Sequence, residues 1–148
     1  MATDARPVIL IRRSLGGPGG AERVFRKYQA ALEGEYGVIP VTEPEGMEGS
    51  SAAKALQFAK MADDVIAQHP QALSISLERG PSAQIYRAGD GVHKHFRRLL
   101  GGISLNPIHW VFPRLDEKSF RAAKAIIANS KMVAEEIRHY YPWTSKKV

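Results

Sequence analysis

The chain has 148 residues, of which 44% are hydrophobic and 24% are charged. This length and composition are typical of a single globular domain with one buried core, and they exclude a disordered or fibrous protein. The absence of cysteine excludes a disulfide framework and a cysteine nucleophile or zinc ligand. No apolar run reaches the roughly 18 residues of a membrane span. The apolar stretch near the N-terminus is too short for a signal peptide, so a cytoplasmic location is expected.

The net charge of +6 is unevenly placed along the chain. Residues 1–80 contain 9 Lys and Arg against 10 Asp and Glu, whereas residues 81–148 contain 12 against 5. A basic half of this kind indicates an anionic partner, such as nucleic acid, anionic lipid or a phosphorylated substrate. The alternative is a basic surface that only keeps the protein in solution.

The hydrophobic pattern predicts strands that alternate with helices along the chain. In chain order we expect a strand at 7–13, a helix from 21 to about 34, a strand at 38–41, a helix at 51–68, a strand at 72–77, a very short strand or turn at 85–88, a helix at 92–100, a helix that opens at 106–107, a strand at 125–128 and a helix at 132–140. Pro40 weakens the second strand, and Pro113 is expected to kink or divide its helix. The alternation predicts an α/β domain with a Rossmann-like, open, mostly parallel sheet and helices on both faces.

A glycine-rich segment, GGPGGAER at 16–23, lies between the first strand and the first helix. Glycines at the start of a helix let backbone N–H groups approach a phosphate, and the helix dipole favours its negative charge. Gly20 is expected to allow this approach and a positive φ. The segment lacks the Gly-Lys-Ser/Thr of a Walker A loop, and Glu22 stands where the dinucleotide fingerprint needs a third glycine. A plain connection between strand and helix is the alternative.

A second group of polar residues comprises Glu78-Arg79 and the segment YRAGDGVH at 86–93. Loops that follow strands hold the chemistry of open α/β sheets. Asp90 lies between two glycines, where packing does not explain it, and its carboxylate can orient or deprotonate a hydroxyl. The alternative is an aspartate that only bonds to its own backbone in a turn.

The histidines do not predict a metal site. His93 and His95 diverge if they lie on a helix, and no acidic ligands are nearby. His93 is instead interpreted as a contact to a phosphate or sugar, with a solvent-exposed helix histidine as the alternative.

The basic residues Lys94, Arg97 and Arg98 lie in an amphipathic segment with Phe96 and Leu99. Such a segment can lie on an anionic membrane surface, or it can simply be a solvated helix face. Nucleic-acid binding is not expected, because the aromatic residues are not interleaved with the basic ones.

Four segments together resemble the N-terminal domain of a family 4 glycosyltransferase with the two-domain GT-B architecture. They are GGPGGAER, SLERGPSAQIYRAGDGVHKHF, LNPIHWVFPRLDEKSF and AKAIIANSKMVAEEIRHYYP. They follow the order of the family and span nearly the whole chain. The second and fourth are most similar to transferases that build lipopolysaccharide core oligosaccharide.

The resemblance implies a retaining, hexosyltransferase-like enzyme that needs no metal and uses a nucleotide-sugar as donor. It implies a glycan or glycolipid as acceptor, with Asp90 facing it as the candidate catalytic carboxylate. Gly19 and Gly20 are implied to lie against the phosphates of the donor. The supporting residues expected on the acceptor side are Arg87, His93 and Glu22.

The family's second Rossmann-like domain, which holds most donor contacts, is not recognisable in this sequence. Residues 1–148 are therefore expected to be one acceptor-side domain that is inactive by itself. Its expected place is the cytoplasm, including the inner face of the cell membrane as a peripheral protein. The alternative is a noncatalytic module that binds an anionic or phosphorylated glycan.

Overall fold

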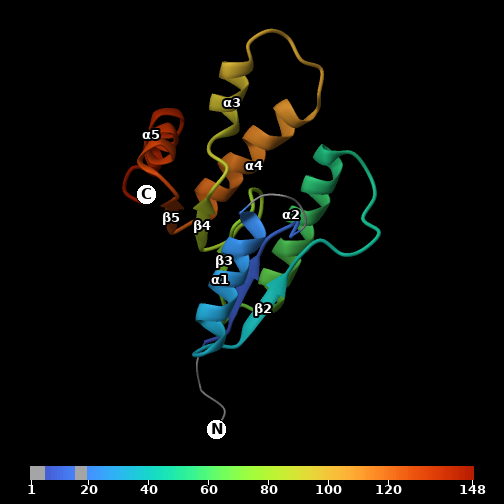
Figure 1. Ribbon diagram of the computed structural model, residues 1–148, viewed down its shortest axis with the longest axis vertical. Helices are drawn as coiled ribbons and strands as arrows, with labels where there is room; N and C mark the ends of the chain where they lie inside the picture. The colour runs from blue at the N-terminus through green and yellow to red at the C-terminus, as the bar shows by residue number, and fades with distance from the viewer. Residues whose placement is uncertain (1–5, 16–19) are drawn as a thin grey trace.

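All five strands of the protein run parallel in one sheet. The computed structural model describes residues 6–15 and 20–148. The strands are β1 (Val8–Ile11), β2 (Val38–Val41), β3 (Leu73–Ser76), β4 (Ile85–Ala88) and β5 (Ala125–Ala128). They lie in the order β2-β1-β3-β4-β5, and every neighbouring pair is parallel (Figure 1). The predicted short strand at 85–88 is therefore a full member of the sheet.

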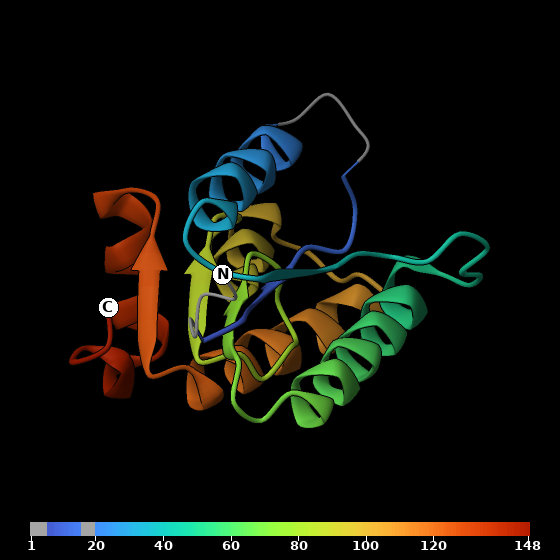
Figure 2. The same cartoon turned by 90° about the horizontal axis from the view of Figure 1, so that it is seen from below.

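Helices cover both faces of this sheet, which confirms the predicted Rossmann-like α/β class (Figure 2). Helix α1 (Ala21–Glu33) packs on one face. Helices α2 (Ser51–Gln68), α4 (Ile108–Ala122) and α5 (Lys131–Tyr140) contribute to the clusters on the other face. Helix α3 (His93–Leu100) packs against α4, and a short 3-10 helix, η1 (Pro142–Thr144), follows α5. None of the helices in the described part of the chain is long and apolar enough to cross a bilayer.

The unbroken apolar run of β1 is explained by burial on both faces. Successive side chains of a strand point to opposite faces, so each face of the central strand β1 must meet a different helix. Val8 and Leu10 join a cluster with Phe25 of α1. Ile9 and Ile11 join a cluster with Phe58 of α2. Strand β1 therefore fixes α1 and α2 on opposite sides of the sheet.

The two prolines that were expected to disturb elements have different outcomes. Pro40 lies in β2, at the edge of the sheet, where a missing N–H on the outer side removes no hydrogen bond between strands. Pro113 lies inside α4, which runs undivided from Ile108 to Ala122, so the expectation that this helix is divided is wrong. The missing N–H removes one intrahelical bond near the start of the helix, while Leu115 and Phe120 are buried beyond it and hold the helix in place.

Serine side chains fix the starts of two helices. The hydroxyl of Ser50 accepts a hydrogen bond from the Ala53 N–H at 3.2 Å, and that of Ser130 accepts one from the Val133 N–H at 3.2 Å. Each side chain satisfies one of the free N–H groups in the first turn. Helix α5 therefore begins at Lys131, one residue before the predicted start.

The loop after β3 is held by close packing at Gly80. Gly80 has φ +110°, and a Cβ there would lie 2.9 Å from the Cβ of Ala59 and 3.2 Å from Leu115. Its N–H donates a hydrogen bond of 2.7 Å to the hydroxyl of Ser119 on α4. The loop that carries Glu78 and Arg79 is thus fixed between α2 and α4.

We predict that Gly80→Ala destabilises the protein more than Gly46→Ala. Gly46 also has positive φ, +80°, but its Cβ would have open space. Gly46→Ala should cost about 1–2 kcal/mol for the backbone conformation alone, whereas Gly80→Ala should cost roughly 2–4 kcal/mol because overpacking is added. Urea unfolding of the two variants measures the difference, and equal losses would contradict the packing argument.

Candidate functional site

Polar side chains gather at the carboxyl edge of the sheet. The strand order reverses between β1 and β3, and ligands of open α/β sheets bind outside the carboxyl ends of strands at such a point. Four polar residues follow strands here: Arg12 after β1, Glu78 in the loop after β3, Asp90 in the loop after β4, and Asn129 directly after β5. The edge therefore has the composition of a binding site.

The guanidinium of Arg12 contacts two of the neighbouring loops. Its Nη1 donates a hydrogen bond of 3.0 Å to the carbonyl of Leu77. The same nitrogen lies 3.8 Å from Oε2 of Glu78 and 3.8 Å from Oδ2 of Asp90. One partly buried cation thus holds the loops after β3 and β4 close to the end of β1.

Glu78 is a largely buried carboxyl beside this cation. Its Oε2 accepts a hydrogen bond from the Arg13 N–H at 3.3 Å. Burial raises the pKa of Glu78 above its ordinary value, although the charges of Arg12 and Arg13 act in the opposite direction. Glu78 thus holds a proton more tightly than a carboxyl in water.

The glycines on either side of Asp90 have separate structural causes. A Cβ on Gly89 would lie 2.7 Å from Nη1 of Arg87, so glycine leaves room for that guanidinium. Gly91 has φ +73°, and a Cβ there would lie 3.0 Å from Glu136. The side chain of Asp90 itself is 64% exposed. The loop therefore presents a carboxylate to solvent at the sheet edge.

A cavity of about 260 Å³, here called the α1 cavity, opens at the start of α1. Its polar lining comprises Arg12, Gly20, Arg87, Asp90 and Asn129. Gly20 is the N-cap of α1, with φ −70° and no side-chain cap hydrogen bond, and a helix start of this kind can bind an anion. The expectation of positive φ at Gly20 is wrong, although the space around its Cα is open as expected. Gly19 lies outside the described residues.

Asp90 also lines two further hollows. One, the α3 cavity, has about 300 Å³ and is bounded by Arg12, Glu78, Arg79, His93 and Phe112, among others. The other, the α3–α5 groove, has about 320 Å³. Asp90 is therefore the side chain at which all three hollows meet.

His93 is turned into the protein and not toward solvent, which corrects the alternative of an exposed helix histidine. Its ring stacks on His109, with 3.1 Å between Nε2 of His93 and Nδ1 of His109, and meets the edge of Phe112. Burial, with the nearby charge of Arg79, lowers the pKa of His93 to about 4. At neutral pH the ring is uncharged, so it can hydrogen-bond to a sugar but adds no positive charge for a phosphate.

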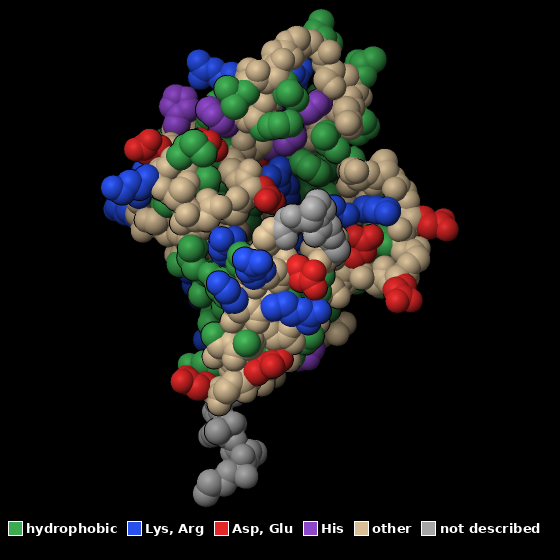
Figure 3. Space-filling view, viewed as in Figure 1, with side chains coloured by type: hydrophobic (Ala, Val, Ile, Leu, Met, Phe, Trp, Pro, Cys, Tyr) green, Lys and Arg blue, Asp and Glu red, His purple; other side chains and the backbone are tan. Residues whose placement is uncertain are grey.

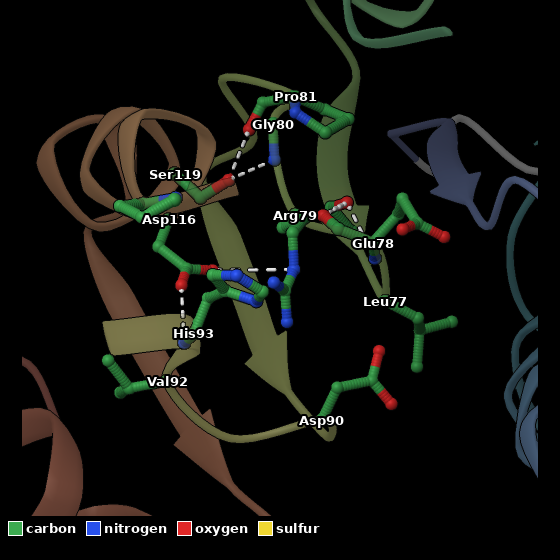
Figure 4. A network of polar contacts seen from close by, with 12 residues as sticks. Leu77, Glu78, Arg79, Gly80, Pro81, Asp90, Val92, His93, Asp116 and Ser119 are labelled. Atoms are coloured by element: carbon green, nitrogen blue, oxygen red, sulfur yellow. Dashed lines mark hydrogen bonds and ion pairs between the residues drawn. The ribbon is translucent and has the colours of Figure 1, made fainter. Parts of the chain in front are cut away.

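Arg79 and Asp116 form a buried pair behind the α3 cavity (Figure 4). Asp116 is fully buried, and its Oδ2 accepts a hydrogen bond from the His93 N–H at 2.9 Å. Its Oδ1 lies 3.5 Å from Nε of Arg79. The guanidinium of Arg79 also lies 4.8 Å from the centre of the Phe112 ring. Asp116 thereby positions both the start of α3 and Arg79.

Of the two remaining predicted site residues, Arg87 lies at the site and Glu22 does not. Arg87 lines the α1 cavity beside Asp90. Glu22 is half-exposed and lies 3.9 Å from Nε of Arg26, one turn further along α1, and it lines none of the three hollows. In the described part of the chain, no three His, Cys, Asp or Glu side chains are grouped as the ligands of a metal ion would be.

Sequence reasoning missed Arg12 and Asn129 as site residues. The Nδ2 of Asn129 donates a hydrogen bond of 2.9 Å to the carbonyl of Gly89. This bond holds the Asp90 loop against the end of β5. Both residues directly follow a strand, and the rule that chemistry lies at the carboxyl edge could have found them.

No protein-family model, curated protein or solved structure matches the chain.

Because Asp116 is buried, we predict that the stability of the protein depends on pH. Burial raises its pKa from 3.8 to about 6 despite the opposing charge of Arg79. The folded protein therefore binds a proton at Asp116 that the unfolded chain releases near pH 4. The stability that this proton gives is present below pH 4 and is lost as the pH rises through about 6, a change of roughly 2–3 kcal/mol.

Asp116→Asn removes this contribution while keeping an oxygen for the His93 N–H. The free energy of unfolding of the wild type minus that of the variant should therefore fall between pH 4 and 6 and stay level above. The difference is needed because His93 changes the stability in the opposite direction. Its pKa is lowered on folding, so the protein loses stability as the pH falls from 6.5 to about 4. This contribution of His93 cancels when the variant is subtracted from the wild type. A difference that stays constant from pH 4 to 7 in urea titrations would refute the raised pKa of Asp116.

Proposed function

We propose that residues 1–148 form the acceptor-side domain of a retaining, family 4 glycosyltransferase. In this proposal the enzyme moves a hexose from a nucleotide-sugar to a glycan or glycolipid of the lipopolysaccharide-core type. One observation carries the proposal: Asp90, Arg12 and the open N-terminus of α1 surround one cavity at the carboxyl edge of the sheet. A cavity of this kind can hold a diphosphate beside a carboxylate.

The donor side of the proposal rests on the α1 cavity. Arg12 and Arg87 contribute positive charge, and Gly20, at the positive end of the α1 dipole, lines the same cavity. Together they would offset the charge that develops on the leaving diphosphate as the bond to the sugar breaks. A donor-binding domain outside residues 1–148 would supply the contacts to the nucleotide and the sugar.

The acceptor side of the proposal rests on Asp90. Its exposed carboxylate would accept a hydrogen bond from the acceptor hydroxyl and orient the oxygen toward the anomeric carbon. The α3 cavity adjoins it, with the neutral ring of His93 and the aromatic ring of Phe112 in its wall. Such a wall suits a sugar, which offers hydroxyl groups and an apolar ring face.

The proposed location is the cytoplasmic face of the cell membrane, where a glycolipid acceptor would be found. The supporting observation is the basic second half of the chain, with Lys94, Arg97 and Arg98 on α3. The alternative is a noncatalytic module that binds an anionic glycan in the same cavities. In that module Asp90 would only contact the glycan and would take no part in a reaction.

We predict that residues 1–148 bind nucleotide-sugars only in the millimolar range and that Gly20→Val weakens this binding. The variant should fold without strain, because φ at Gly20 is −70° and, apart from its chain neighbours, no described residue has an atom within 4 Å of the Cβ position. Its side chain would nevertheless block the approach of a phosphate to the start of α1. Isothermal titration with uridine, adenosine and guanosine diphosphate sugars measures the affinity.

The matched control for this variant is Gly34→Val, at the other end of α1, where a Cβ also has open space. It should leave the affinity unchanged. A micromolar affinity in the wild type would contradict the two-domain proposal, and equal affinities of wild type and Gly20→Val would remove the glycine segment from the donor site.

In a preparation of the transferase that holds both domains, we predict that Asp90→Asn lowers turnover roughly 100-fold or more, the usual effect of losing a positioned acid or base. The fold should persist, since the side chain is 64% exposed. Asp64→Asn, at an exposed position of α2, is the control and should keep full turnover. Wild-type turnover in Asp90→Asn would exclude Asp90 from the reaction and favour the noncatalytic module.

A further inference from the structure

Helix α3 begins without a capping side chain of its own. Its N-cap is Val92, which makes no side-chain cap hydrogen bond, and its first turn contains no acidic residue. The first N–H groups of a helix have no partner within the helix, and this positive end of the helix dipole favours negative charge. Lys94 instead places a cation in the first turn. The start of α3 therefore depends on groups that come from other elements.

Two carboxylates from other helices supply this cap. Oε2 of Glu136 on α5 accepts a hydrogen bond of 3.3 Å from the Val92 N–H. Oδ2 of Asp116 on α4 accepts one of 2.9 Å from the His93 N–H. Both carboxylates lie at the positive end of the α3 dipole, and hydrogen bonds to an ionised group are stronger than those between neutral groups. Consecutive N–H groups at the start of α3 are thus held by α5 and α4.

Glu136 is held in place by a histidine and a tyrosine. Its side chain is only 12% exposed, and its Oε1 lies 3.7 Å from Nε2 of His95. Nδ1 of His95 lies 3.4 Å from the hydroxyl oxygen of Tyr140, and the two rings meet edge to face. Figure 3 shows histidine and acidic side chains together on the surface over α3 and α5. Each carboxylate oxygen of Glu136 therefore faces a group at the start of α3.

The carboxylate of Glu136 also lies against the loop that carries Asp90. Gly91, the residue after Asp90, has φ +73°, and a Cβ there would lie 3.0 Å from Oε2 of Glu136. The other end of the loop is held by the hydrogen bond of 2.9 Å from Asn129 to the carbonyl of Gly89. Asn129 lies just before α5, and Glu136 lies within it. One segment of the chain thus clamps both ends of the Asp90 loop.

The direction of the Asp90 side chain depends on this loop. Among the described residues, the carboxylate of Asp90 has one ion pair, with the guanidinium of Arg12 at 3.8 Å, and accepts no hydrogen bond. A distance of 3.8 Å is too long for a hydrogen bond. The backbone of the loop therefore decides where the carboxylate points at the meeting point of the three hollows (Figure 4).

We propose that Glu136 is a positioning residue for Asp90. Its carboxylate holds the Val92 N–H and lies against Gly91, and so it keeps the loop in the conformation that directs Asp90 into the hollows. Glu136 acts through the loop and takes no part in any bond that forms or breaks. The role of Asp90 in sugar transfer rests on the function proposed above, whereas the positioning of the loop does not.

Amide hydrogen exchange in the 148-residue chain tests the positioning without any donor. Glu136→Ala should raise the exchange rate of the Val92 amide roughly fivefold or more, the effect of losing one helix cap. It should also shift the amide resonances of Asp90 and Gly91. Glu136→Gln keeps an oxygen for the Val92 N–H and should restore slow exchange and the wild-type resonances. The matched control is Glu135→Ala, at the exposed neighbouring position of α5, which should change neither.

Unchanged exchange at Val133 and Ile137, the buried residues of α5, confirms that each variant is folded.

Turnover of the transferase that holds both domains tests the consequence for Asp90. Glu136→Ala should lower kcat roughly tenfold, because a misplaced group loses much of its effect. The KM for the donor should not change, because Glu136 does not line the α1 cavity. A residue that acts only through Asp90 adds nothing once Asp90 is lost, so Glu136→Ala should cause no further loss in the Asp90→Asn variant. A merely structural role would lower turnover in both backgrounds.

The proposal is contradicted by wild-type exchange and resonances of the loop in Glu136→Ala, or by a loop that Glu136→Gln fails to restore. It is also contradicted by a loosened loop with unchanged kcat, or by a loss of turnover in Glu136→Ala that adds to that of Asp90→Asn. If the wild type transfers no sugar, the function proposed above fails by itself. The exchange measurement uses no donor, so it still decides whether Glu136 positions the loop.

Discussion

The arrangement of the carboxyl edge depends on the guanidinium of Arg12. This one cation bonds to the loop after β3 and lies within 3.8 Å of two carboxylates from separate loops. Without it, Glu78 and Asp90 would repel each other across the point where the strand order reverses. A charge in a poorly solvated position acts more strongly than one in water. The cavities at this edge therefore form around Arg12, and the same cation is available to an anionic ligand.

A buried cation–carboxylate pair supports the edge from behind. Asp116 and Arg79 hold the beginning of α3 and one wall of the α3 cavity, while Gly80 fixes the loop between α2 and α4. Helix α3 leaves this edge directly and carries the basic residues Lys94, Arg97 and Arg98. The proposed acceptor site and the proposed contact of α3 with a membrane surface are therefore adjacent in the fold.

Much of the fold could be predicted from the sequence, whereas the site could be predicted only in part. The run VILI and the alternation of strands and helices predicted the parallel sheet, because a strand buried on both faces must be apolar throughout. The glycines around Asp90 indicated a special loop. Gly91 lies against the carboxylate of Glu136 on the distant helix α5, whereas Gly89 lies against the guanidinium of Arg87, only two residues before it. The inward turn of His93 likewise depends on His109 and Phe112, which are distant along the chain, so it could not be read from spacing along a helix.

We propose that the edge around Arg12 receives a diphosphate beside Asp90. The most direct measurement is an NMR titration of the ¹⁵N-labelled chain with a nucleotide-sugar, compared with the same titration of Arg12→Met. The changes in amide chemical shift should cluster at Gly20, Gly89, Asp90 and Asn129, and they should be much smaller in the variant. Shifts that map to another face of the sheet, or that are the same in Arg12→Met, would contradict it.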